Sequence, residues 1–159
     1  EINIIRLSNV FGIPSNNNLN CWKLVVNDFC KQAVLDKKIF INSDGTQVRN
    51  FVSIHEVCRL IDFMIIDYCK GKSLPTIFNF GGNWTLSIFE MAKLIAKQHE
   101  KHFDLYPVIK IKKSPKSSSP KLNFNYDLII KSGFKPNNNN TGDIDELFFH
   151  IKNSLNDFR

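Results

Sequence analysis

The chain has 159 residues, of which 43% are hydrophobic and 23% charged, and its formal net charge is +6. This length allows a single domain with its own core, and the composition is typical of a globular protein, not a disordered or fibrous one. No apolar run is long enough to span a bilayer, because Asp62 and Asp67 interrupt the longest one. The first ten residues lack the basic region and the cleavage site of a signal peptide. The positive charge suits an anionic partner such as a nucleotide or a phosphate, although we interpret the densest basic stretch, residues 110–116, as a solvated loop.

The predicted elements alternate between strands and helices. The first is a strand over residues 2–8, whose apolar, β-branched sequence is typical of a buried parallel strand. A loop follows, marked by Gly12, Pro14 and a cluster of asparagines. Hydrophobic periodicity then predicts helices over residues 21–36, 55–71, 84–100, 126–134 and 143–158, and strands over residues 38–43, 48–54, 76–82 and 108–113.

One helix carries its own start signal. Ser87 and Glu90 have the spacing of a capping box, and Leu86 and Met91 occupy the flanking staple positions. We therefore expect this helix to begin immediately after Ser87.

This order of elements predicts an α/β fold with parallel strand pairing. A parallel sheet needs helices on both faces, yet the opening strand has no helix or strand before it. We therefore expect that strand to be an inner strand of a larger sheet whose other strands lie upstream. The first residue is Glu and not Met, so we expect that the chain begins within a longer protein or has been processed.

The four cysteines predict neither a disulfide nor a zinc site, because none of them form a Cys-x-x-Cys pair. Cys30, Cys58 and Cys69 lie among apolar residues of predicted helices, so we expect them to be buried as small hydrophobic side chains. Cys21 is the fourth. This usage indicates a reducing, cytoplasmic environment.

The histidines predict no metal site. His99 and His102 are three residues apart and could share a metal ion, but no carboxylate or cysteine stands at matching spacing, so we interpret them as a solvated helix end. His150 is expected on the surface or at the boundary of the last helix. For His55, a role in the first turn of its helix is at least as well supported as a functional one.

No catalytic motif is complete in these residues. The chain has no Gly-x-Ser-x-Gly, no His-Glu-x-x-His, no phosphate-binding loop and no Gly-x-Gly-x-x-Gly fingerprint. The dipeptide Gly81-Gly82 is too short to hold a pyrophosphate. A basic nucleic-acid-binding domain is also disfavoured, because no basic stripe is interleaved with aromatic residues.

Three segments, however, resemble a known family when they are taken in order. They are "IIRLSNVFG", "DGTQVRNFVSIHEV" and "FNFGGNWTLSIFEMAKLI", and a later segment, "SGFKP", adds a fourth match. They resemble the patterns R-x-x-N-x-Y-G, G-x-x-x-R-D-F-x-x-x-D-D-V, F-N-I-G and L-G-[WF]-x-P in the C-terminal half of the NAD-dependent epimerase/dehydratase family, the extended short-chain dehydrogenases that act on nucleotide sugars. Asn50 and Phe11 stand where these patterns have Asp and Tyr.

The resemblance implies a division of the chain. Residues 1–12 and 51–82 would supply the last strands and a helix of a Rossmann-type parallel sheet, and residues 13–50 and 83–159 a small α/β substrate-binding portion. The half that binds NAD or NADP would be absent, and so would the Tyr-x-x-x-Lys catalytic pair. We therefore expect no catalytic residue in this chain, no cofactor binding by the chain alone, and no activity without the other half.

The resemblance also implies roles for two residues. Arg49 would hold a phosphate of the nucleotide sugar, and guanidinium offers a planar, permanently charged fork for that purpose. Asn9 would contact the diphosphate region of the substrate. A further basic residue would hold the second phosphate or the ribose, and Lys113, Lys116 and Lys121 remain equal candidates.

The partners expected on this basis are the nucleotide sugar and the missing N-terminal half, without nucleic acid or membrane, and the complete enzyme could be a homodimer. The enzyme would be an epimerase, a dehydratase or a reductase of carbohydrate biosynthesis, that is, an isomerase, a lyase or an oxidoreductase. A cofactor-free nucleotide-sugar binding module, or a non-catalytic remnant of such an enzyme, is the alternative.

Overall fold

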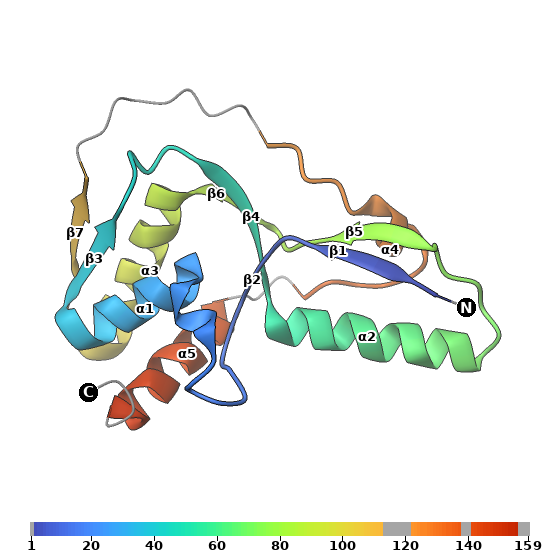
Figure 1. Cartoon of the computed structure of the whole chain (residues 1–159), viewed down its shortest axis with the longest axis horizontal. Helices are drawn as coiled ribbons and strands as arrows, with labels where there is room; N and C mark the ends of the chain where they lie inside the picture. The colour runs from blue at the N-terminus through green and yellow to red at the C-terminus, as the bar shows by residue number, and fades with distance from the viewer. Residues whose placement is uncertain (1, 113–121, 138–140, 156–159) are drawn as a thin grey trace.

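The strands in the described part of the chain form three small sheets (Figure 1). The computed structural model describes residues 2–112, 122–137 and 141–155. Two of the sheets are parallel pairs: β1 (Ile4–Leu7) with β5 (Ile77–Phe80), and β3 (Lys38–Ile41) with β7 (Val108–Ile111). In the third, β4 (Val48–Ser53) lies between β2 (Asn9–Phe11), which is parallel to it, and β6 (Trp84–Ser87), which is antiparallel. The predicted α/β fold with parallel pairing is thus confirmed.

Each predicted helix is present in the described residues, with shifted ends. Ser87 begins its helix as expected: its hydroxyl accepts from Glu90 N at 3.1 Å, and Glu90 Oε2 accepts from Ser87 N at 2.8 Å. Hydrogen bonds from Ser87 also lower the pKa of Glu90. The helices are η1 (Asn20–Lys23, a 3-10 helix), α1 (Val25–Asp36), α2 (Ile54–Cys69), α3 (Ile88–Phe103), α4 (Asp127–Lys131) and α5 (Thr141–Asn153). None of the described helices combines the length and the hydropathy needed to cross a membrane.

The sequence pattern does not predict β2 and β6 as separate strands. The loop predicted after residue 8 starts later, because Asn9, Val10 and Phe11 pair with β4. Likewise, residues 84–87, predicted as the start of a helix, pair antiparallel with β4 before α3 begins. Both strands are three or four residues long, and their partner lies far away in the sequence, so no local periodicity marks them.

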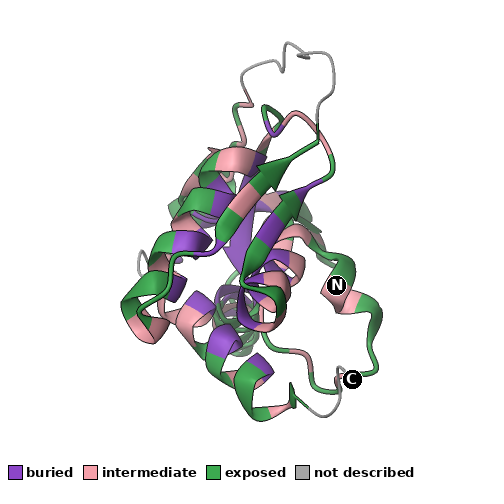
Figure 2. Ribbon diagram, turned by 90° about the vertical axis from the view of Figure 1, so that its left-hand side faces the viewer, coloured by how far each residue is buried: buried purple, intermediate pink, exposed green. Residues whose placement is uncertain are grey.

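Two hydrophobic clusters form the core. In Figure 1, α1, α3 and α5 gather at one end, and α2, α4 and the β1–β5 pair lie at the other. The larger cluster includes Phe29, Met91 and Phe148 from the three helices of the first end. The smaller one includes Leu60 of α2 and Phe80 of β5. Figure 2 shows the buried residues where helices and strands face one another.

α2 and the β1–β5 pair each expose apolar residues. Ile4 is 48% exposed and Ile65 56%. The other large apolar residues exposed on these elements and on the segment before β1 are Ile2, Leu7, Ile54, Ile61, Ile66, Tyr68 and Ile77. A cavity of ≈ 310 Å³ lies between α2 and the start of the chain.

Two of the cysteines are not buried as predicted. Cys30 lies in the larger cluster, where burial raises the pKa of its thiol, but Cys58 and Cys69 of α2 are exposed. They stand on the same helix face as Ile61 and Ile65, at spacings of three and four residues. This face is as apolar as a buried one, but nothing in the described residues covers it.

Candidate functional site

Asn9 and Arg49, the two residues expected to bind substrate, line one open cavity of ≈ 340 Å³. Asn9 is the first residue of β2 and Arg49 lies on the neighbouring strand β4, where Asn9 is aligned with Phe51. We call this the β2–β4 cavity. Its other lining residues are Lys23, Val25, Asp28, Phe29, Phe40, Ile41, Asn42, Ser43, Gln47 and Ile88. Pairing of two strands that are some forty residues apart thus brings the two side chains to one place.

Asn9 also has a structural contact. Its side-chain Nδ2 donates a hydrogen bond of 3.0 Å to the backbone carbonyl of Asn50. This bond crosses from β2 to β4 and fixes the orientation of the amide at the rim of the cavity. The sequence does not predict this contact, because it depends on the register of the two strands.

Arg49 is exposed and its guanidinium folds back along its own strand. Nη1 donates to the carbonyl of Val48 at 3.0 Å, and Nη2 donates to Oε1 of Gln47 at 3.2 Å. None of the ion pairs found among the described residues involves Arg49. The charge is therefore balanced by no acidic side chain of the described chain, and the guanidinium can exchange its hydrogen bonds to these neutral acceptors for stronger ones to an anion.

The start of α1 adds positive character to the same cavity. Leu24 precedes this helix of 12 residues and provides no side-chain cap, so the first N–H groups of the helix have no side-chain acceptor there. Val25, the first residue of the helix, and Lys23 both line the cavity. A helix N-terminus favours negative charge, and so do two cationic side chains. Asp28 is the one acidic residue of the lining, and its Oδ2 accepts from Gln32 Nε2 at 2.8 Å.

Asn50, the neighbour of Arg49, has a different role. It is 2% exposed, its Nδ2 donates to the carbonyl of Gly82 at 2.7 Å, and its Oδ1 accepts from Gly82 N at 3.1 Å. A Cβ at Gly81 would lie 2.2 Å from Asn50 Oδ1, and one at Gly82 the same distance from the carbonyl oxygen of Phe51. The two glycines therefore let β4 approach the end of β5, and no room remains beside them for a pyrophosphate.

The spacing Tyr-x-x-x-Lys does occur, at Tyr68 with Lys72 and at Tyr106 with Lys110, so the expectation that it is absent is wrong as a statement about the sequence. Lys72 lies beyond the end of α2, and Tyr106 lies in the loop before β7. Neither pair is thus on one helix face, where residues four apart become neighbours. None of the four residues lines the β2–β4 cavity. That the chain holds no catalytic residue remains a prediction.

His99 is fully buried, so its interpretation as part of a solvated helix end is wrong. α3 continues to Phe103, and the ring of Phe148 from α5 packs against the imidazole at 5.5 Å. His99 Nδ1 lies 2.7 Å from the carbonyl oxygen of Leu105, and Nε2 has no hydrogen-bond partner among the described residues. Burial lowers the pKa of His99 more than the hydrogen bond raises it.

The other histidines have partners that only the fold brings near. His102 Nε2 lies 3.0 Å from Asp145 Oδ2, so a carboxylate partner exists that the sequence spacing does not reveal. His150 is half-buried, as expected for a boundary position; it stacks on Trp22 and its Nε2 lies 2.7 Å from Asn17 Oδ1. His55 is exposed in the first turn of α2.

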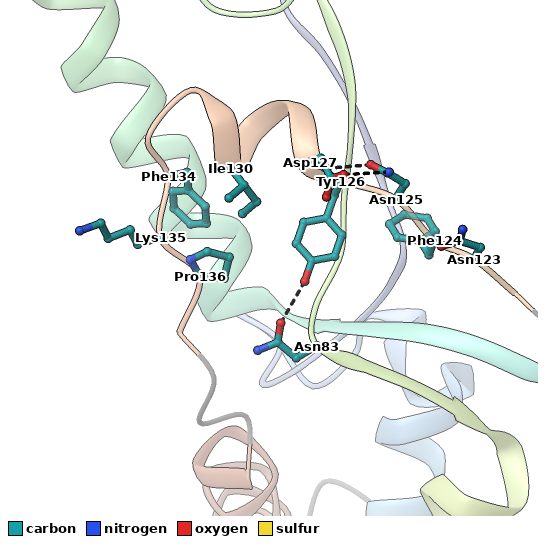
Figure 3. Close-up of a pocket in the computed structure, with 10 residues that line it drawn as sticks. All are labelled: Asn83, Asn123, Phe124, Asn125, Tyr126, Asp127, Ile130, Phe134, Lys135 and Pro136. Carbon is teal, nitrogen blue, oxygen red and sulfur yellow. Dashed lines mark hydrogen bonds between the residues drawn. The ribbon is translucent and has the colours of Figure 1, made fainter.

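A second cavity, of ≈ 590 Å³, lies beyond the end of β5 (Figure 3). Its walls include the rings of Phe124 and Tyr126, and the Tyr126 hydroxyl donates to Asn83 Oδ1 at 2.9 Å. Burial, and secondarily the charge of Asp127, raises the pKa of Tyr126. The sequence does not reveal this cavity, because Asn83 and Tyr126 are 43 residues apart and belong to no motif. Lys113, Lys116 and Lys121 lie outside the described residues.

Comparisons with known proteins agree with the predicted resemblance. Residues 1–81 match the model of the NAD dependent epimerase/dehydratase family. A dTDP-L-rhamnose 4-epimerase of Burkholderia thailandensis is 31% identical over 98 residues, which are 62% of this chain and 26% of that protein.

Solved structures of similar fold include two nucleotide-sugar epimerases. One is the UDP-glucose 4-epimerase of Thermotoga maritima with UDP-glucose, with a TM-score of 0.69, 19% identity and coverage of 96% of this chain and 46% of that one. The other is the UDP-glucuronic acid 4-epimerase of Bacillus cereus with UDP-glucuronic acid and NAD, with a TM-score of 0.66, 22% identity and coverage of 96% and 45%. At these identities the likeness shows the fold, and the chain spans less than half the length of these proteins.

Proposed function

Because the chain belongs to the NAD dependent epimerase/dehydratase family, we propose that it is the substrate-binding part of an NAD(P)-dependent enzyme that epimerises, dehydrates or reduces a nucleotide sugar. The observation that carries this proposal is the shared position of Asn9 and Arg49 at the β2–β4 cavity. The cavity gathers Arg49, Lys23 and the start of α1, and this combination suits a diphosphate.

In this proposal the Arg49 guanidinium leaves Gln47 and Val48 and binds phosphate oxygens with two parallel hydrogen bonds. Asn9, held in place by Asn50, offers an uncharged amide to the same diphosphate region. Asp28, in the first turn of α1, repels phosphate but can accept a hydrogen bond from a sugar hydroxyl, so within the proposal Arg49 and Lys23 hold the diphosphate. Which of Lys113, Lys116 and Lys121 assists remains open within the proposal.

The glycine pair Gly81-Gly82 does not offer a dinucleotide-binding loop. Atoms of Asn50, Phe51 and Phe124 fill the space beside Gly81 and Gly82, and no other glycine pair follows a described strand. We therefore propose that NAD or NADP is bound by another part of the complete enzyme, where it supplies the hydride chemistry. This chain positions the sugar nucleotide, and alone it neither binds the cofactor tightly nor turns over substrate.

The apolar residues exposed on α2 and on the β1–β5 pair support the proposal of a missing half. Ile4, Ile65 and Ile77 are each about half exposed, as residues are when the layer that covers them is absent. We propose that residues 1–12 and 51–82 complete a Rossmann-type sheet with that half. Residues 13–50 and 83–159 then form the substrate-binding portion. A homodimeric complete enzyme is a further part of this proposal.

A cytoplasmic location is also proposed, supported by the four free cysteines of the chain.

The alternative function, a cofactor-free binding module or remnant, shares the β2–β4 cavity and differs only in what precedes Glu1. A reading frame that continues upstream into a cofactor-binding half supports the enzyme. A start codon at this point supports the module.

The test is calorimetric titration of the purified chain with UDP-glucose, dTDP-glucose and NAD in separate experiments. We expect weak binding of a sugar nucleotide and no tight binding of NAD. Addition of the upstream half should create NAD binding. Tight NAD binding or hydride transfer by the chain alone would refute the assignment of cofactor and chemistry to the missing half.

A further inference from the structure

His55, Asp143 and Glu146 form a cluster outside the β2–β4 cavity. His55 lies in the first turn of α2, and the two acidic residues lie in the first two turns of α5. Their potential ligand atoms all lie within 4.8 Å of one another, and this is the one group of three metal-ligating side chains found in the part of the chain that the structure describes. His55 Nδ1 and Asp143 Oδ1 are 3.4 Å apart.

The spacing suits a metal ion. Zinc binds histidine nitrogen and carboxylate oxygen at about 2.0–2.2 Å, so two ligands of a tetrahedral site are roughly 3.4 Å apart. The separation of His55 and Asp143 already has this value. Glu146 stands three residues after Asp143, on the same face of α5, and its exposed side chain can rotate to complete the set. Three protein ligands leave one position for water.

The carboxylates alone would not justify a site. Acidic residues near a helix N-terminus stabilise it through the helix dipole, and Asp143, in the first turn of α5, is placed accordingly. The helix dipole does not explain the position of His55. Its side chain is 67% exposed and extends from the start of α2 toward Asp143 at the start of α5. A histidine that lies close to two carboxylates of a separate helix provides the mixed nitrogen and oxygen ligands that suit zinc and other first-row transition metals.

We propose that His55, Asp143 and Glu146 bind a divalent transition-metal cation, Zn²⁺ foremost, between the first turns of α2 and α5. The ion would join two parts of the core, because α2 contributes to the smaller hydrophobic cluster and α5 to the larger one. Its role is structural: it holds the two clusters together, and it does not depend on the proposed substrate site.

The experiment uses Co²⁺ and Zn²⁺ on the purified chain, co-expressed with the upstream half where that keeps it soluble. Cys58 and Cys69 are replaced by Ser first, because exposed thiols bind the same metals. We expect one Co²⁺ per chain, with absorption that lacks a thiolate charge-transfer band. Zn²⁺ at roughly 100 times its Kd should raise Tm by about 5–10 °C.

The variants decide the outcome. His55→Ala and Glu146→Gln, both at exposed positions, should weaken Zn²⁺ binding at least about tenfold and abolish the Tm increase. His102→Ala is the matched control, because His102 also faces one carboxylate but belongs to no such triad. Binding that survives His55→Ala, or that is lost equally in His102→Ala, would overturn the proposal. The absence of stoichiometric binding would also overturn it and would leave His55 and Asp143 as an ion pair only.

Discussion

Asn50 and Gly82 are joined by two hydrogen bonds, one donated by the side chain at 2.7 Å and one accepted by it at 3.1 Å. The family pattern has Asp at this position, and Asp can accept from Gly82 N but, when ionised, cannot donate to its carbonyl. The Asn therefore satisfies both backbone groups of Gly82 without a charge, and it joins β4 to the end of β5.

The first prediction is that Asn50→Asp destabilises the protein by about 1–3 kcal/mol, because a buried charge replaces a donor. Urea unfolding measured at pH 7.5 tests this. Asn3→Asp is the control, because Asn3 also donates to a backbone carbonyl, that of Pro75, but is exposed; its effect should stay within roughly 0.5 kcal/mol. Equal effects of the two substitutions would contradict the role assigned to Asn50.

The second prediction concerns Arg49 in the complete enzyme. Arg49→Ala should weaken nucleotide-sugar binding roughly ten- to hundredfold, as expected for the loss of hydrogen bonds to a charged group worth about 1.5–3 kcal/mol. Arg49→Lys should weaken it less, but measurably, because an ammonium cannot reproduce the planar fork. Titration calorimetry gives both values.

Two measurements separate this role from a structural one. NAD affinity and Tm should hardly change in either Arg49 variant, because the side chain is exposed and has no acidic partner among the described residues. Lys97→Ala, an exposed cation nine residues along α3 from the cavity residue Ile88, should leave substrate binding intact. A sharp fall in Tm with unchanged substrate affinity would show that Arg49 is structural.

The third prediction is a pH dependence that arises from His99. Its pKa is lower in the folded protein than in the unfolded chain, chiefly because of burial, so the unfolded chain binds a proton more readily. The stabilisation is therefore complete above the unfolded pKa, about 6.5, and is lost as pH falls below it. The free energy of unfolding should decrease by at most about 1.4 kcal/mol per pH unit from this group.

Unfolding curves between pH 8 and pH 5 test this dependence. His99→Gln should flatten the curve, because it removes the titrating group. His102→Gln is the comparison, because it replaces a second imidazole of the same helix and leaves His99 in place. A curve unchanged by His99→Gln would mean that the buried imidazole does not control acid stability.

The fourth prediction concerns the isolated chain. The apolar residues exposed on α2 and on the β1–β5 pair should make the isolated chain marginally stable and prone to association. Ile61→Lys with Ile65→Lys should reduce association, as measured by light scattering, and should weaken binding of the upstream half. Leu128→Lys is the control at an exposed leucine of another helix, α4. A reversible, two-state, monomeric melt of the unmodified chain would contradict the missing-half proposal.

The sequence by itself determined the features that depend on neighbours in the chain. Ser87 and Glu90 are three residues apart, so their capping box forms from local geometry alone and the start of α3 was predictable. The order of strands and helices likewise follows from local periodicity and predicts the α/β class. The ordered motifs identified the family, which residues 1–81 match.

Only the tertiary structure decided what depends on distant partners. Asn9 belongs to a strand because β4 pairs with it, and that pairing places Asn9 at the β2–β4 cavity together with Arg49. His99 is buried because α5 covers α3, whereas Cys58 and Cys69 are exposed because no described element covers their face of α2. Periodicity shows which face of a helix is apolar, but not whether another element packs on it, since burial depends on contacts between segments far apart in the chain.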